Sequence, residues 1–340
     1  MESLKITVLF LRVSKTILFG FLLRVVLFLF FLILGVGILE WRLRTNDPTH
    51  SSAQYAAAKN PRILADTIIL GSSTAVYGYV PKAFHSLSSR GCDFQSTYNF
   101  ALYGAQPPYF NQWYKHVFRP HHPSPALAII SIDWFSAGAA RDQTQDQLGA
   151  YRLAQDAKYL PFKTLLKLFW TLDNKGRKIL ILNSLRLIGS STDLRYLLSP
   201  RVPLQTTGYD QGYLPLDAHI ENVKGGWNRA FSVTPEYIQA LRSLITALQQ
   251  DNAEIILIQF PTYKPDNIKN IEGLVLYQEL ADSFSIHYIN YNKQPYVDLN
   301  ENPKLYADWS HLNSTGAQIF DRKVVSDIRT LLDKGVICAQ

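Results

Sequence analysis

The chain begins with an apolar run that fits a lipid bilayer. Between Ile17 and Leu39 lie 23 residues, of which Arg24 is the only charged one. As a helix, a run of this length spans a hydrocarbon core about 30 Å thick. The cations on its N-terminal side are Lys5, Arg12, Lys15 and Arg24, and those that follow it are Arg42 and Arg44. Because cations tend to stay on the cytoplasmic side, the sequence predicts a cytoplasmic segment over 1–16, one transmembrane helix over 17–39, and a periplasmic or extracellular remainder.

The same run has a second interpretation, as the hydrophobic part of a cleaved signal peptide. Cleavage requires small residues in an Ala-x-Ala pattern, which Gly35-Val36-Gly37 matches poorly. We therefore favour an uncleaved anchor. Residues 40–60 are largely polar or alanine and are expected to form a linker to the folded part of the chain.

The composition favours a folded protein close to a membrane. Charged residues make up 18% of the chain and hydrophobic residues 47%, which excludes a largely disordered chain. The net charge of +7 would also suit nucleic acid, but much of the excess lies beside the apolar run, so no nucleic-acid partner is expected. The two cysteines, Cys92 and Cys338, have no metal-binding spacing and can be paired or free.

Short apolar runs alternate with helical patterns in the rest of the chain. The runs cover residues 67–70, 126–132, 254–260 and 287–291. A helix is predicted after Thr234, which can cap it, and a last helix over about 314–332. Buried strands that alternate with helices predict an α/β domain over residues 61–335, built around a mainly parallel sheet.

A large insertion is expected over about 141–233, because this stretch is long for a simple crossover between strands. Residues 162–172 have an amphipathic helical pattern that fits a membrane surface, a partner, or the core, with core packing favoured. Tyr209, Tyr213 and Trp227 can stack on sugar rings or be ordinary loop aromatics, and they receive no role. His121-His122 is interpreted as a surface loop, since no third metal ligand is near.

Three segments carry residues suited to nucleophilic catalysis. Leu70-Gly71-Ser72-Ser73-Thr74 places serines directly after a predicted strand, and a helix is expected after it, around 81–87. The second segment is 98–105, which contains Gly104, and the third is Asp308-Trp309-Ser310-His311. The letters Gly-Ser-Ser-Thr recur at 189–192, but no clean buried strand precedes them, so that copy is interpreted as a loop.

The order and spacing of these segments resemble the SGNH (GDSL-like) hydrolase family. The resemblance implies a flavodoxin-like, three-layer α/β/α domain in which Ser73 is the nucleophile. It also implies that Asp308 and His311 activate this serine, and that the backbone N–H groups of Ser73 and Gly104 form an oxyanion hole. Serine requires an imidazole to remove its proton, and the imidazole requires a carboxylate, so the residue types fit the role.

One position departs from the family pattern. The third block of the family usually carries an Asn that donates to the oxyanion, and the corresponding place here, after the apolar run 126–132, has Asp133. An ionised carboxylate cannot donate a hydrogen bond. Asp133 is therefore protonated, or serves another role, or the oxyanion hole has two donors.

The resulting expectation is a membrane-anchored serine acyltransferase or esterase without metal or cofactor. Tethered relatives of the family include alginate-type O-acetyltransferases and the D-alanyl transfer protein of teichoic acid synthesis. By that resemblance, the substrate is an acyl ester, and the acyl groups expected are O-acetyl groups of an envelope or exported polysaccharide. A multipass membrane acyltransferase would supply the acyl group. The alternative is a non-catalytic protein of the same fold that binds polysaccharide or assists envelope assembly.

Overall fold

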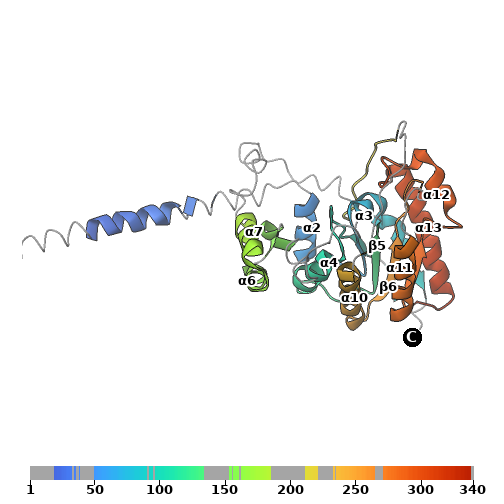
Figure 1. Ribbon diagram of the computed structural model, residues 1–340, viewed down its shortest axis with the longest axis horizontal. Helices are drawn as coiled ribbons and strands as arrows, with labels where there is room; N and C mark the ends of the chain where they lie inside the picture. Colours follow the sequence, from blue (N-terminus) through green and yellow to red (C-terminus); the bar gives the residue numbers. More distant parts are fainter. Residues whose placement is uncertain are drawn as a thin grey trace, which may run out of the picture. The chain divides into compact units, whose positions relative to one another are not determined.

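The computed structural model describes residues 19–32, 34–35, 38, 50–89, 92–94, 96–133, 153–154, 156–160, 162–184, 211–220, 233, 235–264 and 271–337. The described residues from His50 onward fall in one compact unit (Figure 1). Over the described part of the predicted span 17–39, residues 19–32 are helical. None of the helices in the described ranges combines the length and apolar character that crossing a bilayer requires.

A sheet of five parallel strands forms the centre of the unit. Its strands are β1 (Thr67–Leu70), β4 (Thr97–Asn99), β5 (Leu127–Ile132), β6 (Glu254–Gln259) and β7 (His287–Asn290). They lie side by side in the order β4-β1-β5-β6-β7, and every neighbouring pair is parallel. This is the strand order of flavodoxin-like folds, so the prediction of an α/β domain with a mainly parallel sheet is confirmed.

Helices cover both faces of the sheet. Successive side chains of a strand point to opposite faces, so Ile68 and Leu70 enter one hydrophobic cluster and Ile69 enters another. The first cluster includes side chains of α4 (Pro107–Trp113), α10 (Pro235–Gln250) and α11 (Ile271–Phe284). The second includes side chains of α3 (Ser73–Gly78), α12 (Val297–Glu301) and α13 (Ser314–Asp333).

Shorter elements complete the described part. They are α2 (His50–Lys59), α6 (Phe162–Thr171), α7 (Asn174–Ser184), the π-helical turn η2 (Tyr114–Phe118), the 3₁₀ turns η1 (Pro81–Ser86), η4 (Ala157–Tyr159) and η7 (Pro303–Leu305), and an antiparallel ribbon of β2 (Ser88–Ser89) and β3 (Cys92–Asp93). Helices α6 and α7 lie in the predicted insertion.

Three local expectations were wrong. Residues 50–59, expected in the linker, form helix α2, which buries Tyr55 and whose Gln54 Nε2 donates to the carbonyl oxygen of Asn99 at 2.6 Å. The helix expected around 81–87 is a 3₁₀ turn, and the α-helix after β1 begins earlier, at Ser73. His122 is not in an exposed loop, because its ring is buried and stacks on Phe118 with 4.5 Å between ring centroids.

Asp321, on α13, is a buried carboxyl that links two elements of the fold. It is fully buried, its Oδ2 accepts the N–H of Val80 at 2.7 Å, and its Oδ1 has no hydrogen-bond partner. Burial raises the pKa of Asp321 well above its usual value, although the hydrogen bond from Val80 opposes the rise. The folded state therefore binds the carboxyl proton of Asp321 more tightly than the unfolded chain does, since the pKa of an unfolded Asp is about 3.9.

This raised pKa predicts that replacing Asp321 with asparagine stabilises the protein at neutral pH. As the pH rises above about 4, the unfolded state binds fewer protons than the folded state, so Asp321 lowers stability. We expect Asp321→Asn to raise Tm by about 2–4 °C at pH 7 and to change it little near pH 4. Thermal unfolding followed by circular dichroism at both pH values tests this. A difference in Tm that does not depend on pH would contradict it.

Candidate active site

Ser73 lies at the carboxyl end of β1, where the chain turns directly into α3. The side chain of Ser72 caps this helix by accepting the N–H of Thr74 at 3.3 Å. A Cβ atom at Gly71 would lie 2.6 Å from the Cβ of Ala75 and 3.0 Å from that of Ser131. Glycine is therefore required for the close approach of α3 to β5. As the first residue of the helix, Ser73 has a backbone N–H without an acceptor inside it.

Asp308 and His311 lie in a closed loop just before α13. Residues Tyr306 and Leu312 form a β-bridge, and the N–H of Ala307 donates to the carbonyl oxygen of His311 at 2.9 Å. Inside the loop, Asp308 Oδ1 accepts the N–H of His311 at 2.9 Å. The loop is joined to α13 by Asn313, a buried residue whose side chain caps that helix. The relative position of Asp308 and His311 is thus fixed by backbone hydrogen bonds.

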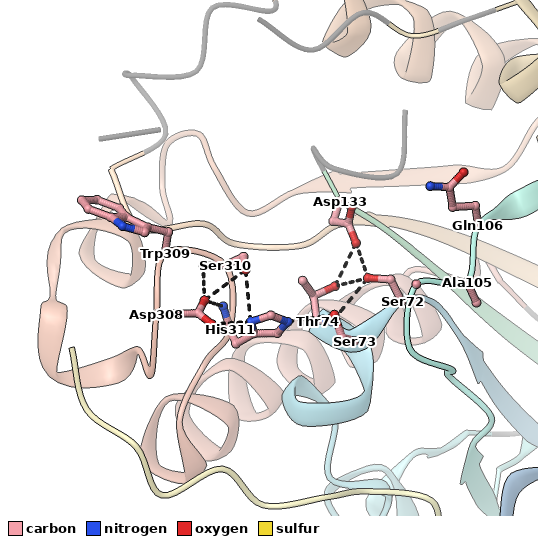
Figure 2. Close-up of a pocket in the computed structure, with 11 residues that line it drawn as sticks. Ser72, Ser73, Thr74, Ala105, Gln106, Asp133, Asp308, Trp309, Ser310 and His311 are labelled. Atoms are coloured by element: carbon pink, nitrogen blue, oxygen red, sulfur yellow. Dashed lines mark hydrogen bonds and ion pairs between the residues drawn. The ribbon is translucent and has the colours of Figure 1, made fainter. Parts of the chain in front are cut away.

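The three residues form one hydrogen-bonded chain (Figure 2). His311 Nε2 lies 2.8 Å from Ser73 Oγ, and His311 Nδ1 lies 2.7 Å from Asp308 Oδ2. A carboxylate only accepts, so Nδ1 carries the ring proton and Nε2 is the acceptor that faces the serine hydroxyl. This tautomer is the one that a general base for Ser73 requires.

The charge of Asp308 is preserved at neutral pH. Burial alone would raise the pKa of this carboxyl, but the hydrogen bond from His311 and the electrostatic attraction to its ring outweigh that effect, with help from the backbone N–H groups of Ser310 and His311. The pKa of Asp308 is lowered to about 2. Asp308 is therefore ionised at neutral pH, although 53% of its side chain is exposed.

Gly104 lies in the turn that follows β4, at the same edge of the sheet as Ser73. The N–H of Ala105 donates to the carbonyl oxygen of Leu102 at 3.0 Å, and Gly104 has a φ of +64°. A residue with a side chain is strained in this conformation, which favours glycine. Gly104 and Ser73 both line a cavity of about 440 Å³, together with His311 and Asp308. Both residues predicted to supply oxyanion donors thus line the same cavity.

Asp133, at the end of β5, lines this cavity too, but it contacts hydroxyl groups. Its Oδ2 accepts hydrogen bonds from Ser72 Oγ and, at 3.3 Å, from Thr74 Oγ1 (Figure 2). The residue is 3% exposed. Asp133 therefore connects β5 to the start of α3, which is a positioning contact that the sequence did not suggest.

Two further side chains support His311. The Ser310 hydroxyl donates to Asp308 Oδ1 at 3.0 Å and lies 3.1 Å from His311 Nδ1. The ring of Tyr77, on α3, meets the imidazole edge-on with 5.3 Å between centroids. Neither role was predicted from the sequence. Ser310 could have been suspected from its place between Asp308 and His311, whereas nothing in the sequence indicates Tyr77.

A segment of the predicted insertion packs beside these elements. Over residues 211–220, the N–H of Leu214 donates to the carbonyl oxygen of Val76, and the N–H of Ile220 donates to that of Tyr306. Tyr213 is 8% exposed, so it is a packed residue rather than a platform for a sugar ring. Tyr209 and Trp227 lie outside the described residues, as does the second Gly-Ser-Ser-Thr copy at 189–192.

Comparisons with known proteins find only distant similarity. No protein-family model matches the chain. No curated protein matches it.

Among solved structures, the lipase/acylhydrolase from Enterococcus faecalis is 13% identical, with a TM-score of 0.37 over 78% of this chain and 95% of that one. A putative platelet activating factor from Streptococcus pneumonia is 12% identical, with a TM-score of 0.40 over 87% and 99%. A putative acylhydrolase from Bacteroides fragilis NCTC 9343 is 13% identical, with a TM-score of 0.37 over 82% and 94%. Similarities of this size assign no activity, so the function must follow from the residues of the site.

Proposed function

We propose that this protein is a serine-dependent acyl-transfer enzyme of the SGNH type, with Ser73 as its nucleophile. The observation that supports this most strongly is the chain from Ser73 Oγ through the His311 ring to Asp308 Oδ2, with distances of 2.8 and 2.7 Å. An imidazole in this position can accept the serine proton, and the carboxylate stabilises the charged ring that results. The adjoining cavity of about 440 Å³ gives room for an ester beside the serine.

The chemistry follows from these positions. Ser73 Oγ attacks the acyl carbonyl carbon while its proton passes to His311 Nε2, and the carbonyl oxygen becomes an oxyanion near the N–H groups of Ser73 and Gly104. The intermediate collapses when His311 returns the proton to the leaving alkoxide, which leaves an acyl-serine. Water or a second hydroxyl then gives its proton to His311 and attacks the acyl carbon. The bond from the acyl carbon to Ser73 Oγ breaks, His311 returns the proton to Oγ, and the acid or the new ester leaves. Each oxyanion donor is worth about 2.7–4 kcal/mol in measured cases.

The finer form of the proposal is a membrane-anchored acyltransferase that acts on acyl groups, O-acetyl above all, of an envelope or exported polysaccharide. The apolar run over 17–39 supports an anchor whose N-terminus lies in the cytoplasm. The resemblance to tethered SGNH transferases supports the polysaccharide acceptor and a multipass membrane acyltransferase as the acyl donor. Asp133 beside the oxyanion donors favours a slow enzyme supplied by a partner over a fast esterase.

Transfer and hydrolysis are separated by the fate of the acetyl group. The full-length chain in detergent is incubated with p-nitrophenyl acetate, with and without an oligosaccharide acceptor, and the products are followed by mass spectrometry. We expect acceptor molecules that have gained one acetyl group, and no such product from Ser73→Ala. Acetate as the sole product would make the protein an esterase. No turnover of any activated ester would contradict the enzymatic proposal.

A second candidate, a non-catalytic protein of the same fold, is favoured by Asp133. At this position the family has a donor to the oxyanion, whereas the carboxyl here accepts hydrogen bonds from Ser72 and Thr74. A binding protein that had lost catalysis would tolerate this change, since no oxyanion has to be stabilised.

The substitution Asp133→Asn tests how this position affects catalysis. The asparagine oxygen can still accept from Ser72 and Thr74, and its amide group adds a donor where the carboxylate has none. We expect kcat on p-nitrophenyl acetate to rise about tenfold or more, since an oxyanion donor is worth 10²–10³ in kcat. Asp298→Asn, on an exposed residue paired with Lys323, is the matched control and should change nothing. A fall in kcat would show that Asp133 itself is required.

A further inference from the structure

Helix α6, in the insertion, exposes a row of large apolar side chains. Phe162, Leu166 and Trp170 are 79%, 48% and 71% exposed. Their spacing of four residues places them along one face of the helix. On the neighbouring helix α7, Ile181 is 51% exposed as well. We call Phe162, Leu166 and Trp170 the apolar stripe of α6.

The stripe is exposed although α6 is firmly packed. On its other side, Thr164 and Leu168 are buried, and Leu168 belongs to the hydrophobic cluster on the first face of the sheet. Arg177 of α7 joins the two helices, because its Nε donates to the carbonyl oxygen of Phe169 at 2.9 Å and its guanidinium lies 5.1 Å from the Phe169 ring centroid. The helix thus packs into the core on one side and still exposes three large apolar side chains on the other.

The charge around the stripe is positive. Residues 162–184 contain five cations and one carboxylate, a net charge of +4; the cations are Lys163, Lys167, Lys175, Arg177 and Lys178, and the carboxylate is Asp173. Lys163 and Lys167 are exposed on α6 itself. The region extends to η2, since the pKa of His116 is lowered by burial and by the charges of Lys167 and Lys115.

We propose that the apolar stripe of α6 inserts into the surface of an anionic lipid bilayer, with the surrounding lysines at the phosphate groups. An amphipathic helix with a basic polar face and with Trp and Phe on its apolar face is the type that lies in a membrane interface. Trp prefers the depth of the headgroups, because its ring is apolar and its N–H is polar. This inference does not depend on the activity of Ser73.

The positive charge also favours a membrane over a second copy of the chain as the surface that covers the apolar stripe. If a second copy covered the stripe through a two-fold contact, regions of net charge +4 would face each other, which is unfavourable. An anionic lipid surface instead attracts each lysine near it by about 1 kcal/mol, or about fivefold in the binding equilibrium. A lipid surface therefore offers an apolar layer to the stripe and anionic phosphate groups to the lysines.

Fluorescence quenching of Trp170 tests the proposal in the full-length chain. The protein is reconstituted into vesicles of phosphatidylglycerol and phosphatidylcholine in equal parts, with or without brominated acyl chains. The signal of Trp170 is the difference between the unmodified chain and Trp170→Phe, which removes the contributions of the other tryptophans. Since Trp170 is largely exposed, Trp170→Phe should leave the thermal unfolding curve unchanged.

The expected result is that brominated lipid quenches the Trp170 signal strongly. The pair Lys163→Gln and Lys167→Gln should lower the equilibrium constant for insertion of the stripe about fivefold per charge. Lys304→Gln with Lys334→Gln, on exposed residues elsewhere, should not change it. A Trp170 signal that brominated lipid leaves unchanged would overturn the proposal. So would a blue-shifted Trp170 emission that depends on protein concentration in lipid-free detergent, since a second copy would then cover the stripe.

Discussion

Replacing Ser73 with alanine is expected to lower ester cleavage by about 10⁴-fold or more. Ser73 Oγ lies 2.8 Å from His311 Nε2, and alanine has no side-chain oxygen there to carry the acyl group. Loss of the nucleophile in comparable serine enzymes costs up to about 10⁶ in kcat, and the remaining activity comes from oxyanion contacts and binding. The measurement is the initial rate on p-nitrophenyl acetate with purified full-length protein.

The chain itself offers a matched control for this substitution. Ser191 occupies the same place in the second Gly-Ser-Ser-Thr copy, at 189–192, as Ser73 does in the first. We expect Ser191→Ala to retain the full rate. Equal activity of Ser73→Ala and the unmodified chain would contradict the role of Ser73, and loss of activity in Ser191→Ala alone would transfer the role to the other copy.

The second large effect is expected for Asp308→Asn, a loss of about 10⁴-fold in kcat. An asparagine amide at this position would donate to His311 Nδ1 in place of the acceptor Oδ2 that lies 2.7 Å away. The ring proton would then move to Nε2, which could no longer accept the proton of Ser73. The structure would be preserved while the tautomer of His311 is wrong.

The pH profile tests whether the effect stays constant over the range in which Asp308 is ionised. Because the pKa of Asp308 is lowered to about 2, the carboxylate is ionised throughout pH 5–8, and its own titration lies below that range. We expect Asp308→Asn to be slower than the unmodified chain by the same order at every pH in this range. Asp298→Asn is again the control. A variant that recovers the full rate at one end of the range would contradict the assigned role.

The strands could be predicted because burial on both faces of the sheet gives a simple sequence pattern. β1, β5 and β6 are covered by helices on both faces, so they appear as continuous apolar runs such as Thr67–Leu70 and Glu254–Gln259. β4 was missed because it has three residues, Thr97–Asn99, two of them polar. The order of the strands could be anticipated from the family resemblance alone, since the sequence of a strand does not indicate which strands lie beside it.

The elements that were mispredicted depend on contacts between distant parts of the chain. The sequence of helix α2 has the composition of a polar linker, whereas its place in the fold involves Gln54, which donates to the carbonyl oxygen of Asn99, 45 residues away. The positions of Ser73, Asp308 and His311 could be proposed from their order and residue types. The role of Asp133 could not, because its partners Ser72 and Thr74 lie about 60 positions earlier in the sequence.

Covalent labelling shows whether the serine at position 73 is activated. The full-length chain is treated with a fluorophosphonate, which reacts with serines that a neighbouring imidazole activates, and the modified residue is located by peptide mass spectrometry. We expect one adduct, on Ser73, which disappears in His311→Ala although Ser73 is still present. An unlabelled protein that is otherwise folded, or an adduct on Ser72 or Ser191, would contradict it.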